Sequence, residues 1–135
     1  MKNLLLLLFT SLFISFSNNL YSQHNTKTYN CYSTNIYRVL SDNSPKLIKS
    51  FTEETIVIIN VKSILVNSKT DGKNYTEQFN VTKVKDDDDA FILYTNNLLG
   101  EEGDTFMLYK DKNLILRMTF LAEANETIMI AYEFK

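Results

Sequence analysis

Apolar and aromatic residues alternate with a period of two along most of the chain after residue 55. This is the period of a β-strand, whose successive side chains point to opposite faces of the sheet. No long segment has the period of a helix, although residues 122–126 fit a single helical turn. The pattern predicts strands at about residues 35–40, 46–51, 55–60, 63–68, 75–84, 90–96, 105–110, 114–121 and 127–134.

The breaks between these segments contain turn-forming residues. They read "DNSP" at 42–45, "KTDGKN" at 69–74, "LGEEGD" at 99–104 and "KDKN" at 110–113. A crossover between parallel strands needs about a dozen residues, and these connections are shorter, so consecutive strands should be antiparallel. The predicted fold class is therefore all-β: an antiparallel meander of about eight or nine strands, forming a small, lipocalin-like barrel or a two-layer sheet.

The last four predicted strands are apolar on both faces. We assign one face to the core; it carries Phe91, Leu93, Phe106, Leu108, Leu116, Met118, Phe120, Ile128, Ile130, Tyr132 and Phe134. The opposite face is a candidate interaction surface of Ile92, Tyr94, Met107, Tyr109, Ile115, Arg117, Leu121 and Met129, with Arg117 as a charge at the rim. A solvated antiparallel face is usually polar, so we expect the N-terminal part of the chain, or else a partner protein or ligand, to cover this face.

The N-terminus has the pattern of a secretory signal peptide. Lys2 precedes a largely apolar stretch at residues 4–16, and a polar stretch follows. The apolar stretch is shorter than the roughly 20 residues that cross a bilayer, which disfavours a transmembrane anchor. The predicted organisation is a signal peptide at residues 1–22, a flexible segment at 23–34 and a single all-β domain at 35–135, located in the periplasm or outside the cell.

The leader and the composition also resemble those of a bacterial group. A run of leucines ends in "YSQ", and the chain has 12 Lys against 2 Arg, with 15 Asn. These features resemble small secreted proteins of Bacteroidetes. The resemblance implies export, and it implies no activity and no functional residue.

Charge and cysteine content exclude some classes of function. Without the leader the chain has 13 basic and 16 acidic residues, a net charge of −3. Nucleic-acid binding usually needs a basic face, so nucleic acid is not an expected partner. Cys31 is the single cysteine, so no internal disulfide can form, and a buried thiol is its most common fate.

The acidic residues do not match a known metal or catalytic pattern. Four consecutive aspartates at 86–89 lack the spacing and the glycine of a calcium loop, so we interpret them as a solvated turn. The acidic residues near 101–104 should lie at the other end of a strand, more than about 20 Å away. His24 is the single histidine and lies near the N-terminus, which leaves a nucleophilic triad without an anchored base. Only Glu77 and Glu133 are acids within predicted strands.

The leading functional hypothesis is a non-enzymatic binding or interaction module that contacts a protein through its apolar β-surface. One alternative is a lipocalin-like carrier of a small apolar ligand, which would need a pocket of roughly 300 Å³ or more. Another is a hydrolase that uses Glu77 and Glu133 as paired carboxylates. No catalytic residue, metal ligand or cofactor is predicted.

Overall fold

The computed structural model describes residues 26–96 and 100–135. These residues form nine strands. In chain order they are β1 (Lys27–Val39), β2 (Pro45–Phe51), β3 (Thr55–Ile59), β4 (Ser63–Thr70), β5 (Lys73–Asp86), β6 (Ala90–Asn96), β7 (Glu102–Tyr109), β8 (Leu114–Leu121) and β9 (Glu126–Phe134). No helix in the described part of the chain is long and apolar enough to cross a membrane. The predicted signal peptide lies outside the described residues.

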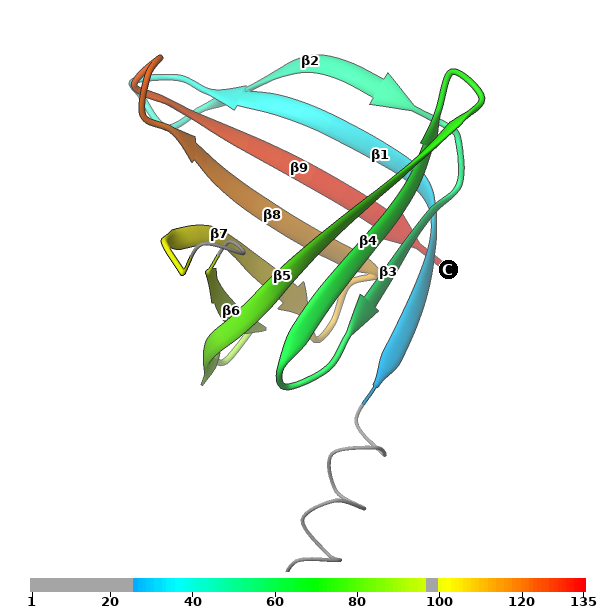
Figure 1. Cartoon of the computed structure of the whole chain (residues 1–135). Helices are drawn as coiled ribbons and strands as arrows, with labels where there is room; N and C mark the ends of the chain where they lie inside the picture. Colours follow the sequence, from blue (N-terminus) through cyan, green and yellow to red (C-terminus); the bar gives the residue numbers. More distant parts are fainter. Residues whose placement is uncertain (1–25, 97–99) are drawn as a thin grey trace, which may run out of the picture.

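The strands form one antiparallel sheet that closes on itself (Figure 1). Each strand from β3 to β9 pairs with the next, and β9 pairs with β1, which also pairs with β3. The result is a closed barrel of eight strands, with β2 as an additional strand beside β1. The predicted all-β meander is confirmed, and of the two predicted architectures the barrel is the correct one.

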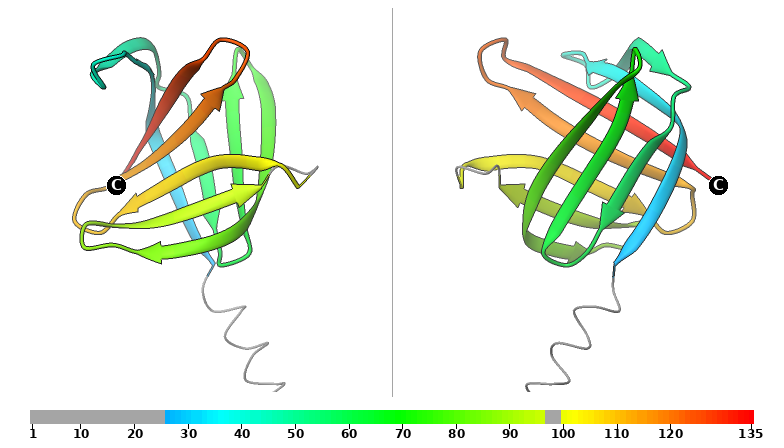
Figure 2. Two further views of the ribbon diagram at one scale, coloured as in Figure 1. Left: turned by 90° about the vertical axis from the view of Figure 1, so that its left-hand side faces the viewer. Right: turned by 45° about the vertical axis from the view of Figure 1, so that its right-hand side comes forward.

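Strand β1 closes the barrel because it pairs along both of its edges. Its first part pairs with β3, its second part pairs with β2, and β9 runs along its other edge. A register shift between Cys31 and Ser33 marks the bend, as a β-bulge commonly does (Figure 2). The prediction of a flexible segment at 23–34 is wrong from residue 27 onward. Backbone pairing with β3 and β9 holds this mostly polar stretch in place, and Tyr29 and Cys31 direct their side chains toward the core.

The hairpin between β4 and β5 shows how local sequence sets the register. Thr70 pairs with Lys73, so Asp71 and Gly72 form a two-residue turn. Both have positive φ, 51° and 76°. A two-residue hairpin turn of this kind favours Asp-Gly, because glycine has no Cβ to clash at positive φ. The "DG" of the sequence therefore fixes the pairing of these strands.

The middle of the barrel is filled with side chains, and we call this region the waist. Phe106, Ile64 and Ile115 are fully buried there. The Phe79 ring meets the edge of the Phe106 ring, with centroids 5.1 Å apart. An eight-stranded barrel is just wide enough for side chains to fill it, which is what the waist shows. The waist divides the interior into two separate ends.

Strand β8 has the opposite orientation from the one predicted. Ile115 and Arg117 point inward and are 0% and 8% exposed, whereas Phe120 points outward and is 63% exposed. Both faces of this strand are apolar apart from Arg117 and Thr119, and a charge is normally placed outside a core. The sequence pattern therefore favoured the wrong face, and Leu116 and Met118 lie on the outer side with Phe120.

The outer surface over β6 to β9 is apolar. Register places Ile92, Met107, Leu116 and Ala131 in one row across these strands. We expected the N-terminal part of the chain to cover this face. Instead β1 joins the edge of the sheet, and all nine described strands belong to that single sheet, so none of them packs over the row.

Candidate functional site

The barrel has a hollow at each end, one on either side of the waist. The hollow near the β4–β5 turn has a volume of about 180 Å³, and we call it the arginine cavity. The hollow where β1 begins has a volume of about 290 Å³, and we call it the apolar mouth. The arginine cavity is lined by Thr34, Ile36, Phe51, Thr55, Val66, Ser68, Lys69, Thr70, Glu77, Arg117, Ile130 and Tyr132. The apolar mouth is lined by Lys27, Tyr29, Ile59, Asn60, Val61, Val84, Phe91, Leu93 and Leu108.

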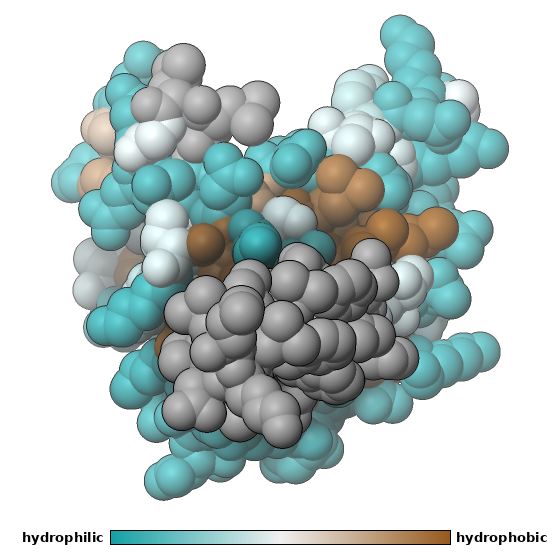
Figure 3. Space-filling view, turned by 60° about the horizontal axis from the view of Figure 1, so that its bottom comes forward, coloured by the Kyte–Doolittle hydropathy of each residue, from teal (hydrophilic) through white to brown (hydrophobic). Residues whose placement is uncertain are grey.

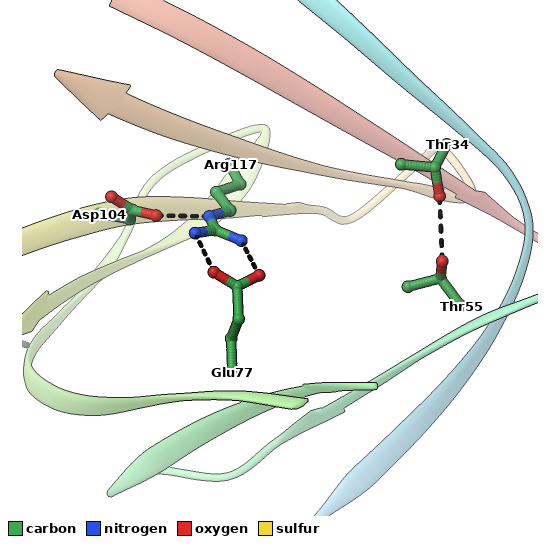
Figure 4. Close-up of polar contacts among 5 residues, drawn as sticks. All are labelled: Thr34, Thr55, Glu77, Asp104 and Arg117. Carbon is green, nitrogen blue, oxygen red and sulfur yellow. Dashed lines mark hydrogen bonds and ion pairs between the residues drawn. The ribbon is translucent and has the colours of Figure 1, made fainter. Parts of the chain in front are cut away.

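Arg117 is the centre of an ion-pair network that bridges three strands (Figure 4). From β8 its two terminal nitrogens donate to the two carboxylate oxygens of Glu77 on β5, at 2.7 and 2.9 Å. Its Nε donates to Asp104 on β7. The guanidinium also lies 4.7 Å from the centre of the Phe79 ring. Three of the five N–H groups of Arg117 therefore bind carboxylates within the protein.

The ion pair keeps Arg117 and Glu77 charged. Burial alone would lower the pKa of Arg117, but the hydrogen bond to Glu77 and the nearby Tyr132 and Asp104 raise it overall. The hydrogen bond from Arg117 lowers the pKa of Glu77, although partial burial acts in the opposite direction. Burial raises the pKa of Tyr132, so its hydroxyl is neutral.

Hydroxyl groups form the rest of the polar wall of the arginine cavity. Thr34 donates to Thr55 across the β1–β3 junction, at 3.3 Å, and both side chains are buried (Figure 4). Thr95 lies beyond the cavity and donates to the backbone oxygen of Asp104, at 2.7 Å. The polar groups at this end bind mainly to each other, which is how a buried polar network avoids the cost of desolvation.

The apolar mouth differs because its side chains are open to solvent. Val61, Val84 and Phe91 line it and are 51%, 45% and 38% exposed. Leu93 is buried and forms the floor against the waist. Figure 3 looks toward this end of the barrel, and hydrophobic residues gather in the middle of the visible face with hydrophilic residues around them. Exposed large apolar side chains that gather in a hollow are unusual, and they tend to mark a binding site.

The mouth has few polar groups. The Asn60 side chain is occupied by its own turn, because it accepts from the backbone of Lys62 and Ser63 and donates to the Ser63 hydroxyl. Lys27 pairs in register with Ile59, so its side chain lies on the inner face of the barrel. It is the only charged residue in the lining, and it has no side-chain partner among the described residues.

The four aspartates lie at the end of β5 and in the turn that follows it, at the same end as the mouth. Lys110 pairs with Asp86 at 2.5 Å, and Lys85 pairs with Asp87 at 3.2 Å. The ion pair to Lys85 lowers the pKa of Asp87. Among residues 26–96 and 100–135, no three His, Cys, Asp or Glu side chains gather in a way that fits a metal ion.

The predicted interaction surface is divided between the two sides of the barrel wall. Ile92, Tyr94, Met107, Tyr109 and Met129 lie together on the outer face, as the register of β6 to β9 requires. Ile115, Arg117 and Leu121 have inward parity, so they do not belong to that surface. The placement of Arg117 at an outer rim is wrong, because two carboxylates inside the barrel neutralise its charge.

The two candidate catalytic acids lie on opposite faces of the sheet. Glu77 points inward to Arg117, whereas Glu133 on β9 accepts from Tyr32 and Asn35 on the outer side. They do not form a pair. A carboxylate whose pKa is lowered, such as that of Glu77, is also a poor proton donor or acceptor at neutral pH.

Cys31 is buried against the waist, 1% exposed. Burial raises the pKa of its thiol to about 11, and a backbone hydrogen bond only partly offsets this. A thiol with this pKa is protonated at neutral pH and therefore unreactive. Cys31 acts as a small core residue.

Sequence reasoning missed the Glu77–Arg117–Asp104 network, although a signal for it was present. Glu77 has the same parity as the aromatic residues Tyr75 and Phe79 of its strand, and Asp104 has the same parity as Phe106, which we assigned to the core. Two inward carboxylates need a buried cation nearby. Arg117 is one of only two arginines in the chain, and it is in the middle of a strand.

Comparison of the chain with protein-family models, with curated proteins and with solved structures gives no match.

Proposed function

We propose that this protein is an exported, non-enzymatic binding protein that holds a small apolar ligand in the apolar mouth of its barrel. The observation that carries the proposal is the cluster of exposed Val61, Val84 and Phe91 around a hollow of about 290 Å³. Transfer of such side chains out of water is favourable by about 25 cal/mol per Å², so an apolar ligand gains free energy there. The predicted signal peptide supports export.

The arginine cavity is a weaker candidate for the ligand site. Its strongest donor, Arg117, is already bound by Glu77 and Asp104. A ligand would have to displace one of these carboxylates, and a buried charge that loses its partner is costly. The mouth requires no such exchange, because its lining residues lose only contact with water.

Probe displacement on the purified protein tests the proposal. We expect the neutral fluorophore N-phenyl-1-naphthylamine to bind with a single saturable site, and decanol to displace it. Val84→Lys places an ammonium in the mouth and should weaken binding of both by about tenfold, equivalent to roughly 1.4 kcal/mol. Leu47→Lys is the matched control, since Leu47 is also exposed but lies on β2, away from the mouth.

The outcome distinguishes the mouth from the rest of the surface. Weaker binding in Val84→Lys with unchanged binding in Leu47→Lys supports the mouth. Equal loss in both variants, or no saturable binding in the parent protein, contradicts the proposal.

Contact with another protein through the outer face is a second candidate function. The partly exposed Ile92, Met107 and Leu116 support it, because an apolar patch on a barrel exterior commonly marks an interface. A photo-crosslinker at Met107 should give one discrete protein adduct in the host, and a crosslinker at Gln78 on the polar side should give none. The adduct protein, once purified, should bind the parent chain and not Met107→Lys. Equal crosslinking at both positions would remove this candidate.

A further inference from the structure

The charge at the apolar mouth identifies a class of ligand, and this step rests on the function proposed above. Within residues 26–96 and 100–135, Lys27 is the only charged residue that lines the mouth, and it lies beside Ile59 at the edge of the apolar wall. Its side chain has no partner among the described residues. We propose that the ligand is a single-chain anionic amphiphile whose alkyl part lies in the mouth and whose anionic head pairs with Lys27.

The neighbouring charges do not cancel this preference. Asp86 and Asp87 of the acidic turn are paired with Lys110 and Lys85. Asp88 and Asp89 belong to the same turn but do not line the mouth. Lys62 follows Val61 directly in the chain but, like Asp88 and Asp89, does not line the mouth. Among the described residues, a cationic head would meet Lys27 and no carboxylate in the lining.

The size of the mouth favours a single chain. Pockets for small molecules usually measure about 300–1,000 Å³, and the mouth, at about 290 Å³, lies at the small end of this range. The waist side chains Phe106 and Ile64 are fully buried and block further entry. One short alkyl chain matches this space better than a lipid with two long chains.

Three ligands with the same alkyl chain and different head groups test whether the mouth prefers an anion. Decanoate, decanol and decylammonium are titrated against the purified protein at pH 7 by displacement of N-phenyl-1-naphthylamine. Decanoate should bind roughly twofold to fivefold more tightly than decanol, which is the range of a partly exposed ion pair. Decylammonium should bind most weakly, and the differences should shrink in about 1 M salt.

Variants of Lys27 test whether this residue causes the preference for decanoate. Lys27→Gln should abolish the preference for decanoate over decanol, and Lys27→Glu should favour decylammonium. Lys69→Gln at the arginine cavity is the matched control and should keep the parent preference. Loss of the preference in Lys69→Gln, with Lys27→Gln like the parent, would place the anion at the other end and overturn the inference. Lys27 is exposed, so circular dichroism should show unchanged folding.

The results separate this inference from the proposed function. If none of the three ligands binds, the proposed function fails. If all three bind equally and Lys27→Gln matches the parent, the function stands and the anionic ligand is excluded. Sedimentation with vesicles of phosphatidylcholine and phosphatidylglycerol tests whether the anion that pairs with Lys27 is instead the headgroup of a lipid in a bilayer. Lysine-dependent binding to vesicles that equals the binding of decanoate would contradict a free single-chain ligand.

Discussion

The two ends of the barrel interior share strands β1, β3 and β5 but differ in how their polar groups are paired. In the arginine cavity Arg117, Glu77 and Asp104 bind one another. In the apolar mouth Lys27 has no side-chain partner among residues 26–96 and 100–135, and apolar side chains are open to water. A network that is closed on itself is explained by folding alone. Exposed apolar groups beside a lysine reduce no folding cost, which is why we propose the mouth as the binding site.

Among the variants that test this comparison, Arg117→Met should cause the largest loss of stability. It leaves Asp104, whose side chain is 12% exposed, without its cation, so we expect a loss of roughly 3–5 kcal/mol in the free energy of unfolding. Urea denaturation measures the change. Arg38→Met is the control: Arg38 pairs with Glu126 at the surface, and the loss there should stay below about 1 kcal/mol.

A double variant keeps this prediction testable if Arg117→Met does not fold. Adding Asp104→Leu removes the carboxylate that was left unpaired and should recover part of the lost stability. Equal losses in Arg117→Met and Arg38→Met would show that the network contributes no more than a surface ion pair.

A smaller effect should appear when Glu77 is replaced by Gln. Arg117 lowers the pKa of Glu77 below its ordinary value of 4.5 in the folded protein. The carboxylate therefore contributes stability above that value, and the contribution is lost as the pH falls through the lowered pKa. Because the side chain is 49% exposed, we expect about 1 kcal/mol or less at pH 7.

Thermal unfolding between pH 7 and pH 3 measures this contribution. The difference between the parent protein and Glu77→Gln should shrink toward the acid end. Glu53→Gln, in the exposed segment between β2 and β3, is the control and should show no such trend. A difference that grows on acidification would contradict the assigned role of Glu77.

At the other end, Val84→Lys should change stability by less than about 0.5 kcal/mol, because Val84 is exposed. The same variant should weaken binding of an apolar ligand, as described above. Urea denaturation beside ligand titration measures both. A large loss of stability would mean that the mouth is part of the core.

The smallest expected effect concerns the acidic turn beside the mouth. Asp86 and Asp87 are occupied by lysines, and no metal-binding group is found in the described part of the chain. Millimolar calcium should therefore leave Tm unchanged both in the parent and in a variant with Asp87→Asn and Asp88→Asn. An increase of Tm with calcium in the parent alone would show that the turn binds the ion.

The strand pattern was predictable because short connections and period-two alternation are local. Eight of the nine predicted strands agree with the structure within three residues at each end. Strand β1 was predicted too short because residues 27–34 are polar and are held by pairing with distant strands. The orientation of β8 depended on Arg117, whose partners come from β5 and β7. The carboxylates that neutralise Arg117 lie on other strands, so the sequence of β8 alone does not reveal them.

The position of the candidate site was not predictable from the sequence. Apolar residues on both faces led us to expect a binding surface, and Ile92 and Met107 do share the outer face. The apolar mouth combines Lys27 and Tyr29 from β1 with Val84, Phe91 and Leu108 from three other strands. Only closure of the barrel brings these residues together, and closure is set by pairing of β1 with β9.

Methyl-resolved NMR during a titration with decanol tests the central claim most directly, because both ends carry methyl reporters. The reporters of the apolar mouth are Ile59, Val61, Val84, Leu93 and Leu108, and those of the arginine cavity are Ile36, Val66 and Ile130. We predict saturable shifts with one common Kd in the first set and none in the second. Shifts confined to the second set, or no saturable shift in either set, would contradict the apolar mouth as the binding site.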